Sequence, residues 1–370
     1  MDKCIRMSVN TGKEYINAIM ISQNAFYERT EITIHNENNS FSNPNSLVED
    51  VKAGVKTMFL DGGERFANAQ LSAYSMQMIV DPFGRNCQLN LDAKYMCTGK
   101  QLNDFTCCAA EIGELLKRKA KGCRNEYDKV LIFDRWVKAH FTYEDRDVIT
   151  DHSAINLLQS REGVCQAIAA LAVKVLPYMG IEAVYISGKG NGGHGWGRHA
   201  WNAVLIGNRW IHVDFTFSLS TLTLPSTKSK FESKMFCVSH KWDNKLYSNE
   251  ALDYKLKLQN ELQNEEIKMV INSPICVFGG VQIENTCEVL IRKDGCLWID
   301  IMSFIRILGG SCEVISNKDE LNVCLSNQRT IIRNISEHMN GVYFDIKVLE
   351  QFGKIIRYAN GIGFKATGRR

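Results

Sequence analysis

The sequence predicts an α+β protein of more than one domain, and three observations indicate this class. The chain has 370 residues, enough for two or three separate cores. A helical segment near its middle is followed by two strands joined by a tight turn, which is typical of a helix packed on an antiparallel sheet. The last third repeats one pattern of turn, strand, helix and strand. We therefore expect domains at 1–120, 121–272 and 273–370.

The first segment, residues 1–120, predicts a small α/β region. Apolar residues recur at helical spacing in three stretches and alternate in three others, with a polar loop at 36–46. None of these elements carries a recognisable chemical motif, so we expect a packing or substrate-lining role. The expected helices are 14–26, 47–60 and 104–121, and the expected strands are 31–35, 74–80 and 88–96.

The middle segment begins with an expected helix at 127–141 and contains a cysteine at the start of a second one. Residues 166–179 have a helical apolar period that ends at Gly180. Cys165 would thus lie at a helix N-terminus, where the dipole favours a thiolate and unpaired backbone N–H groups can receive an oxyanion. The alternative is an ordinary buried cysteine, one of thirteen in the chain.

A predicted β-hairpin follows this helix and brings a histidine beside an aspartate. Residues 199–206 and 210–217 are expected strands, and Gly207-Asn208 is a turn signal between them. A turn centred there pairs residue 199 with residue 216. His199 and Asp214 then become diagonal neighbours on one face of the sheet. A cysteine, a histidine and an aspartate in this order are what acyl transfer through a thiol requires.

These motifs resemble the transglutaminase-like superfamily. The resemblance rests on Gly-Val-Cys-Gln-Ala from residue 163, His-Ala-Trp-Asn from 199 and Trp-Ile-His-Val-Asp-Phe-Thr from 210, and covers about 125–218. It implies a papain-like core with Cys165 as nucleophile, His199 as base and Asp214 as the group that orients the histidine. It also implies an amide substrate, which is either a peptide bond or a glutamine carboxamide. Relatives often carry Gly-Tyr-Ala where this chain has Ala-Ile-Ala at 167–169, which concerns the shape of the substrate pocket.

Other residues are weaker candidates for the same site. Backbone N–H of Cys165 is the expected first oxyanion donor, and Tyr143 is favoured over Gln159 and Trp136 as the second. Trp201 and His194 are possible substrate-lining residues. His194 lies in a glycine-rich run at 188–197, which lacks a strand or helix pattern and is expected to be a flexible flap. His152 and His212 are alternatives to His199 as the base.

The C-terminal segment contains two related units that start at Asp294 and Asn340. Each is expected to form a turn, a short strand, an amphipathic helix and a further strand. The units resemble weakly the stalk-like domain named after the N-terminus of copper amine oxidases. Neither unit contains a histidine, so the resemblance implies no copper. A binding or spacing role, with a protein or surface ligand, is the expectation. The four recurring apolar positions are Ile299, Ile301, Phe304 and Leu308 in the first unit and Phe344, Ile346, Leu349 and Phe352 in the second.

Composition limits the other functional classes. The formal charge is +3, with 44 basic and 41 acidic residues, so no nucleic-acid partner is expected. The basic run Lys117, Arg118, Lys119 and Lys121 is expected to end a helix. No apolar stretch is long enough to span a membrane. The cysteines lack Cys-x-x-Cys pairs and the chain lacks His-Glu-x-x-His, so neither a metal site nor a cofactor is expected.

The sequence therefore predicts a thiol-dependent amide hydrolase or acyltransferase, most simply a cysteine peptidase or deamidase that acts on protein or peptide amides. A cross-linking transglutaminase is the alternative within the class, and a non-enzymatic scaffold on the same fold is the alternative outside it. The first ten residues lack an apolar signal-peptide core, so a cytoplasmic protein is expected, or a secreted or surface-attached one if the chain is trimmed. A Ser/Thr/Lys-rich linker is expected at 219–232 and a helix at 252–264.

Overall fold

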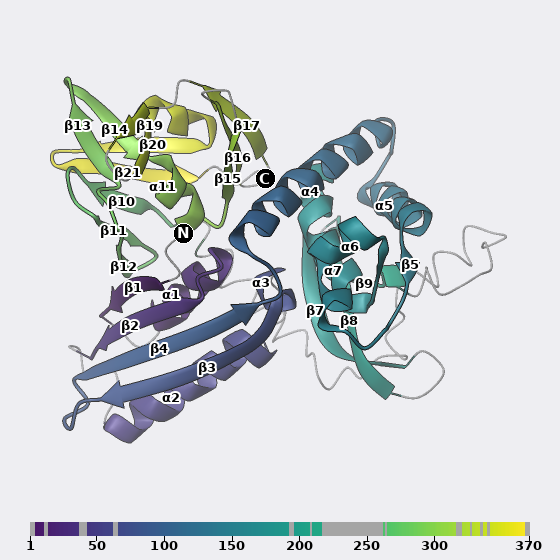
Figure 1. Cartoon of the computed structure of the whole chain (residues 1–370), viewed down its shortest axis with the longest axis horizontal. Coiled ribbons are helices and arrows are strands. Elements are labelled where there is room, and N and C mark those ends of the chain that lie inside the picture. Colours follow the sequence, from purple (N-terminus) through teal and green to yellow (C-terminus); the bar gives the residue numbers. More distant parts are fainter. Residues whose placement is uncertain are drawn as a thin grey trace. The chain divides into compact units, whose positions relative to one another are not determined.

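The structure is a computed structural model, and it divides into two compact units. The first unit comprises residues 1–60, 73–95 and 256–370, and the second comprises 61–72 and 96–255. The α+β prediction is confirmed, because helices and mainly antiparallel sheets form separate layers in both (Figure 1). The described residues are 4–10, 14–36, 43–61, 66–191, 196–207, 209–216, 262, 265–315, 320–325, 328–333, 336–338 and 341–366.

The first unit is built on a nine-stranded sheet that joins both ends of the chain. Its order is β20-β21-β10-β11-β12-β1-β2-β4-β3. The N-terminal strand β1 lies parallel to β2 and antiparallel to β12, which comes more than 270 residues later. The strands are β1 (Cys4–Val9), β2 (Arg29–His35), β3 (Leu71–Val80), β4 (Asn86–Tyr95), β10 (Ile267–Val270), β11 (Ile275–Phe278), β12 (Val281–Glu284), β20 (Gly353–Tyr358) and β21 (Gly361–Ala366).

One face of this sheet is apolar and covered by helices, and the other is polar. Alternate residues of β1, β2 and β12 are buried against α1 (Glu14–Asn24). The helix α2 (Pro44–Lys56) packs on α1 and begins with a capping box in which Asn43 and Ser46 satisfy each other's backbone N–H groups. A π-helical turn, Thr57–Asp61, follows α2. The period-2 alternation therefore leaves polar side chains on the open face.

The two C-terminal units pair with each other. Strands β14 and β19 are antiparallel neighbours, with Ile299 opposite Phe344. Seven of the eight recurring apolar residues are buried, and Leu308 is half-buried. The resemblance to the amine oxidase stalk domain stays a prediction. The elements are β13 (Leu290–Lys293), β14 (Cys296–Asp300), α11 (Ile301–Ile307), β15 (Ser311–Ile315), β16 (Glu320–Leu325), β17 (Gln328–Arg333), β18 (Ser336–His338), β19 (Gly341–Asp345) and a 3₁₀ helix, η5 (Ile346–Gln351).

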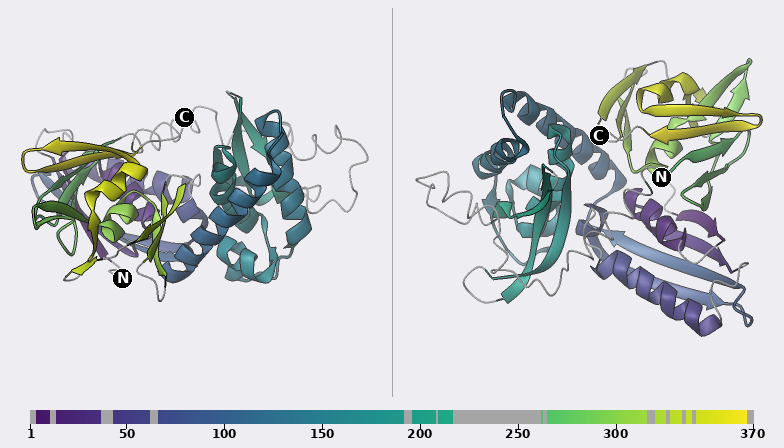
Figure 2. Two further views of the ribbon diagram at one scale, coloured as in Figure 1. Left: turned by 90° about the horizontal axis from the view of Figure 1, so that it is seen from above. Right: turned by 180° about the vertical axis from the view of Figure 1, so that it is seen from behind.

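The second unit surrounds one apolar helix, α7 (Cys165–Val175). The antiparallel sheet β7-β8-β9 contacts α7, as do α3, α4 and α6 (Figures 1 and 2). Seven of its residues, mostly alanine and leucine, are buried. The other elements are α3 (Phe66–Ala69), α4 (Gly99–Lys119), α5 (Glu126–His140), β5 (Thr142–Tyr143), η2 (Ile149–His152), α6 (Ala154–Ser160), β6 (Glu162–Gly163), η3 (Leu176–Met179), β7 (Ala183–Asn191), β8 (Trp196–Ile206) and β9 (Arg209–Val213).

Small residues allow the helices of this unit to approach closely. A Cβ atom on Gly113 of α4 would lie 2.3 Å from the Cβ of Tyr178, so a larger residue would push α4 away from η3.

Pro177 has no N–H to donate, which accounts for the change from α7 to a 3₁₀ turn where the sequence predicted one continuous helix. Gly180 ends the segment with a φ of 77°, as expected from its position.

The structure differs from the sequence prediction in three further respects. Strand β1 was not foreseen, because six residues at a chain end give little periodicity. The glycine-rich run was expected to lack regular structure, but β7 extends to Asn191 and β8 starts at Trp196. Residues 1–60 and 256–370, expected in separate domains, share one sheet, so the compact units do not follow the expected borders. Strand pairing between distant segments leaves no local signal. The expected linker at 219–232 and all but Leu262 of the helix at 252–264 lie outside the described residues.

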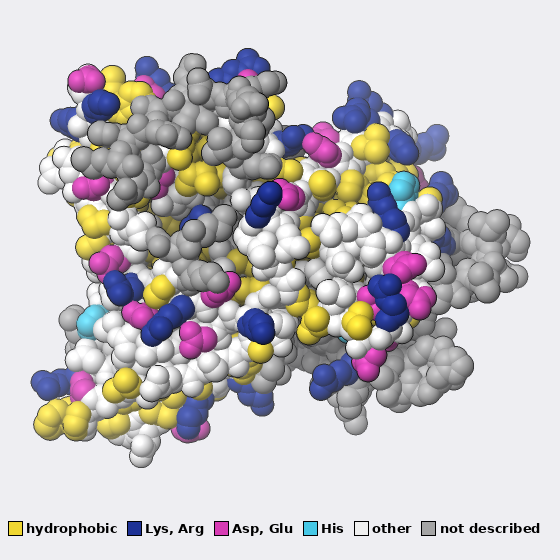
Figure 3. Space-filling view, viewed as in Figure 1, with side chains coloured by type: hydrophobic (Ala, Val, Ile, Leu, Met, Phe, Trp, Pro, Cys, Tyr) yellow, Lys and Arg dark blue, Asp and Glu magenta, His cyan; other side chains and the backbone are white. Residues whose placement is uncertain are grey.

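Charged side chains of both signs are dispersed over the face seen in Figure 3. Lys117, Arg118 and Lys119 fall in the last turn of α4, so the prediction that this basic run ends a helix is confirmed. Within the part of the chain that the structure describes, no helix is long and apolar enough to cross a membrane.

Candidate active site

Cys165 is the first residue of α7 and is half-buried. Val164 precedes it in an extended conformation and offers no side-chain cap to the helix. The backbone N–H of Val164 itself donates to the carbonyl of Asp151 at 3.1 Å, which fixes the chain just before the nucleophile. The first N–H groups of an α-helix have no intrahelical acceptor. The N–H of Cys165, at the first position of α7, therefore has no acceptor within its own helix.

Tight packing holds the entry to this helix. A Cβ atom on Gly163 would lie 3.0 Å from Leu157 and 3.1 Å from the Asp151 carbonyl. On the other side, the Nε2 of Gln166 donates to the carbonyl of Ala69 at 2.6 Å. The nucleophile therefore sits on a fixed backbone, which is what a site needs to hold a reacting atom in position.

His199 and Asp214 meet through a short hydrogen bond. The Nε2 of His199 lies 2.7 Å from the Oδ2 of Asp214, whose side chain is fully buried. The second oxygen of Asp214 accepts from the backbone N–H of Thr216 at 2.9 Å. The hairpin register, Asn202 opposite Val213, confirms the predicted pairing. The second strand ends at Val213, so Asp214 lies just beyond it and not within it.

The thiol of Cys165 contacts the same imidazole. Burial disfavours a charged His199, but its hydrogen bonds to Asp214 and Cys165 and the charges of both groups outweigh this effect and raise its pKa from 6.5 to about 10. Because Nε2 faces Asp214, Nδ1 is the ring nitrogen left for the thiol. The three predicted residues are thus brought together in one chain of contacts. This arrangement favours a protonated imidazole beside the thiol group.

His212 belongs to a different contact. Its Nδ1 accepts a hydrogen bond from the indole N–H of Trp201 at 2.8 Å. Burial lowers the pKa of His212, so the ring is kept neutral. Trp201 is buried, and its ring lies 6.1 Å from that of His199, tilted by 15°. Trp201 therefore supports the imidazole of His199 from one side. His152 is half-buried at the end of η2, and His194 lies outside the described residues.

Tyr143 is placed beside the nucleophile by a short parallel pairing. Strand β5 aligns Tyr143 with Gly163 of β6, two residues before Cys165. Burial, followed by the charges of Cys165, Asp145 and Asp214, raises the pKa of Tyr143 to about 12. Its phenol therefore remains protonated at neutral pH and can donate a hydrogen bond. The side chain is 39% exposed, so it borders the site and is not a core residue.

The other two candidates lie elsewhere. Gln159 is exposed on α6, and among the described residues it makes no hydrogen bond with the Cys165, His199 or Asp214 side chains. Trp136 is buried in α5 and stacks on His140, with ring centroids 4.7 Å apart. Gln159 therefore faces solvent, and Trp136 has a packing role.

Two groups around the site were not foreseen from the sequence. The buried carboxylate of Asp151 binds Arg146 through both oxygens, at 2.5 and 3.2 Å, and this pair anchors the loop between Tyr143 and Cys165. Asn202 is fully buried, and its Nδ2 donates to the carbonyls of Ala169 at 2.9 Å and Val184 at 3.2 Å. Asn202 therefore ties β8 to α7 and β7. The place of Asn202 in the His-Ala-Trp-Asn block was a usable signal, whereas nothing local marked Arg146 or Asp151.

The candidate residues lie in a segment of the chain that matches a known family. Residues 114–215 match the family model described as the transglutaminase-like superfamily. Solved structures are similar at low identity. One is a candidate cysteine protease from Cytophaga hutchinsonii, 17% identical over 40% of this chain and 65% of that chain, with a TM-score of 0.27. Another is described as a TGase, 13% identical over 60% of this chain and 56% of that chain, with a TM-score of 0.29.

A third similar structure is the periplasmic domain of TgpA from Pseudomonas aeruginosa bound to ethylmercury. It is 13% identical over 41% of this chain and 69% of that chain, with a TM-score of 0.25. The chain spans less than two thirds of the length of the first two structures. No curated protein matches the sequence. The family match includes α7 and the whole β7-β8-β9 sheet, so residues 114–215 form a domain of the transglutaminase-like superfamily.

Proposed function

We propose that this protein is a thiol-dependent amide hydrolase that acts on protein or peptide substrates. The observation that carries the proposal is the position of His199 between Cys165 and the buried carboxylate of Asp214. A superfamily match alone does not decide between an enzyme and a scaffold, but a scaffold has no need for an imidazole held between a thiol and a carboxylate.

The residues suit the following steps. The Cys165 thiolate attacks the substrate carbonyl carbon, and the backbone N–H of Cys165 and the phenol of Tyr143 donate to the oxygen that becomes negative. The imidazolium of His199 gives its proton to the amide nitrogen as the carbon–nitrogen bond breaks, which leaves a thioester. Water then attacks the thioester while His199 takes a proton from it, and the acid leaves as the thiolate re-forms. Asp214 keeps its negative charge and holds the ring in place.

Hydrolysis is preferred to cross-linking because water needs no binding site of its own, whereas an amine donor does. The three amide reactions leave different products from one glutamine-containing peptide. Cleavage releases a new amino terminus, deamidation releases ammonia and leaves glutamate, and transamidation incorporates an added fluorescent primary amine. Mass spectrometry of the peptide after incubation separates the three. We expect cleavage or deamidation without amine incorporation.

The nucleophile can be tested without knowing the substrate. Iodoacetamide at neutral pH, followed by mass mapping, should label Cys165 faster than the other twelve of the thirteen cysteines. The sharp comparison is with Cys108 and Cys296, which are exposed whereas Cys165 is half-buried. Burial raises the pKa of Cys87 to about 11 and that of Cys97 to about 12, so these thiols should react slowly.

Matched variants complete the test. Cys165→Ser should abolish both turnover and the fast labelling phase, and Cys123→Ser, which changes a half-buried cysteine of the same unit, should alter neither. Fast labelling led by Cys108 or Cys296 would contradict the assignment. Fast labelling of Cys165 with no product from any amide substrate would favour the scaffold alternative.

A further inference from the structure

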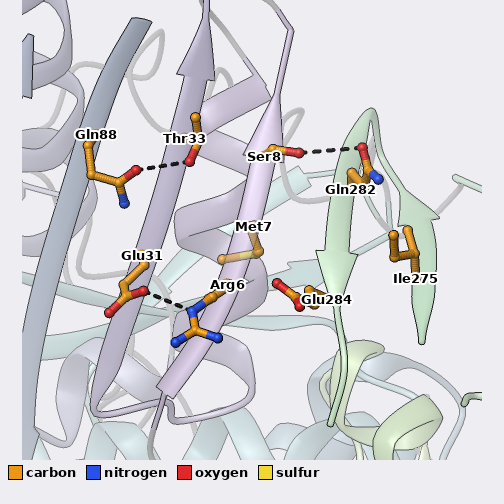
Figure 4. A pocket seen from close by; sticks show the side chains of 9 residues that line it. All are labelled: Arg6, Met7, Ser8, Glu31, Thr33, Gln88, Ile275, Gln282 and Glu284. Carbon is orange, nitrogen blue, oxygen red and sulfur yellow. Dashed lines mark hydrogen bonds and ion pairs between the residues drawn. The ribbon is translucent and has the colours of Figure 1, made fainter. Parts of the chain in front are cut away.

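The open face of the nine-stranded sheet contains a cavity of about 280 Å³ in the first unit. It is lined by side chains from β1, β2 and β4 near the N-terminus and from β11 and β12 near the C-terminus (Figure 4). None of the proposed catalytic residues belongs to this unit. The cavity exists only where β1 pairs with β12, so both ends of the chain are needed to form it.

Only side chains are available for recognition on this face. The backbone N–H and C=O groups of the lining strands are used in the ladders between neighbouring strands. An extended peptide binds a sheet mainly through free backbone groups at an edge, and β1 and β12 are central strands with neighbours on both sides. The ligand is therefore one that side-chain groups can recognise without any backbone pairing.

Positive and negative side chains offset one another at one level of the cavity. Arg6 lies in register between Glu31 of β2 and Glu284 of β12. Its Nε is 3.1 Å from one oxygen of Glu31, and Arg29 lies 3.3 Å from the other. Arg6 lines the cavity between the two carboxylates, and Arg29, which is not among the lining residues, pairs with Glu31 and offsets the second negative charge. A strongly charged ligand would meet no excess of opposite charge, which favours a neutral one.

The next row is made of hydroxyl and amide groups. Ser8 is in register with Thr33 on one side and Gln282 on the other. The Thr33 hydroxyl donates to the Oε1 of Gln88 at 2.9 Å, and the Ser8 hydroxyl donates to the Oε1 of Gln282 at 3.4 Å. Both hydroxyl oxygens keep lone pairs that can accept, and among the described residues the Nε2 of Gln282 makes no hydrogen bond. Figure 4 shows the side chains of Ser8 and Gln282 pointing toward one another from neighbouring strands.

We infer that this cavity binds a neutral saccharide of one or two sugar rings. Sugar hydroxyls both donate and accept, which matches a row that presents both kinds of group at adjacent strand positions. The exposed side chain of Ile275 offers an apolar contact for the C–H face of a ring. The volume of about 280 Å³ lies just below the ~300–1,000 Å³ typical of ligand pockets, so the ligand is small.

The test uses the full chain with three neutral disaccharides as probes: cellobiose, maltose and diacetylchitobiose. Saturation-transfer NMR detects a weak ligand. We expect transfer to at least one probe with a dissociation constant on the order of millimolar, because only a few hydrogen bonds offset the cost of binding. Because no net charge is involved, raising the salt concentration to about 0.5 M should leave the affinity unchanged.

Three variants locate the site. Ser8→Val and Gln282→Leu should each weaken binding roughly 5- to 10-fold, the loss expected for about one hydrogen bond. Gln77→Leu removes a matched amide from an exposed position of β3 outside the cavity and should have no effect. Gln282 is also exposed, so its substitution should not impair folding.

Three outcomes would overturn the inference. The first is the absence of transfer to every neutral probe. The second is an affinity that is unchanged from the native protein in both Ser8→Val and Gln282→Leu. The third is a charged sugar, such as glucuronic acid or glucosamine, that binds more tightly than the neutral probes with an affinity that falls with salt. The readout requires no thiol chemistry. The saccharide proposal can therefore be supported or refuted independently of the function proposed for Cys165.

Discussion

Replacing Asp214 by Asn removes the charge that holds the imidazole of His199 while keeping the size of the side chain. The structure gives a magnitude. The pKa of His199 is raised from 6.5 to about 10 against the effect of burial, and Asp214 contributes both its hydrogen bond and its charge to that rise. If about half of the rise is lost, the pKa falls by roughly 2 units, which is about 2.7 kcal/mol and a factor of about 100 in the imidazolium–thiolate balance.

The assay is the rate of Cys165 alkylation by iodoacetamide between pH 5 and pH 10. In the native protein the fast phase should persist to high pH, since His199 keeps its proton until about pH 10. In Asp214→Asn the fast phase should end near pH 8, and above that pH the rate should fall below the native rate by a factor that approaches roughly 100 near pH 10. Asp92→Asn changes an exposed aspartate on β4 and serves as the control.

Turnover should fall further than alkylation, by a factor on the order of 10³–10⁴, because the ring must also present the correct tautomer to the leaving group. An Asp214→Asn protein that is folded and keeps the native rate and pH profile of alkylation would refute the reasoning. The hydrogen bond to Asp214 would then have no bearing on the reactivity of Cys165.

Three further predictions concern the same unit. Tyr143→Phe should lower kcat by about 10²-fold with little change in KM and none in Cys165 alkylation, as expected for an oxyanion donor; an unchanged kcat would assign Tyr143 to packing. Arg146→Gln leaves the buried charge of Asp151 without its guanidinium partner and should lower the free energy of unfolding in urea by about 2 kcal/mol. Arg333→Gln removes an exposed ion pair and should lower it by under about 1 kcal/mol. Equal losses in the two variants would contradict the role of burial. Because the folded pKa of His199 is raised, the stabilising contribution of this residue should be complete below pH 6.5 and should disappear as the pH rises to about 10. The urea midpoint of the native protein should therefore fall over this pH range, and that of His199→Gln should fall less. Curves of midpoint against pH that run parallel in the two proteins would argue against the raised pKa.

Local patterns in the sequence were sufficient for much of the candidate site. A helix that starts at Cys165 follows from an apolar period that begins there and ends at Gly180. The register of the β8–β9 hairpin follows from a two-residue turn and a period of two, which place His199 diagonal to Asp214. Both signals act over fewer than twenty residues. Over so few residues the chain has few alternative conformations, so the helix start and the hairpin register can be predicted from a single sequence.

The position of Tyr143 and the bracing by Arg146 and Asp151 depend on contacts between segments. Tyr143 comes beside Cys165 because β5 pairs with β6, and each of these strands has only two residues. So short a strand has no periodicity to detect. A buried ion pair such as Arg146 with Asp151 likewise looks like ordinary surface charge in the sequence, since burial is a property of the folded chain.

The sequence by itself determined the α+β class, the helix that bears Cys165, the hairpin that joins His199 to Asp214 and the presence of two related C-terminal units. The tertiary structure alone decided that both ends of the chain share one sheet and that a polar cavity forms where β1 meets β12. The physical reason is that helix and hairpin formation depends on neighbours in the chain. Pairing across more than 270 residues depends on which apolar faces can be buried together, and no local pattern records that choice.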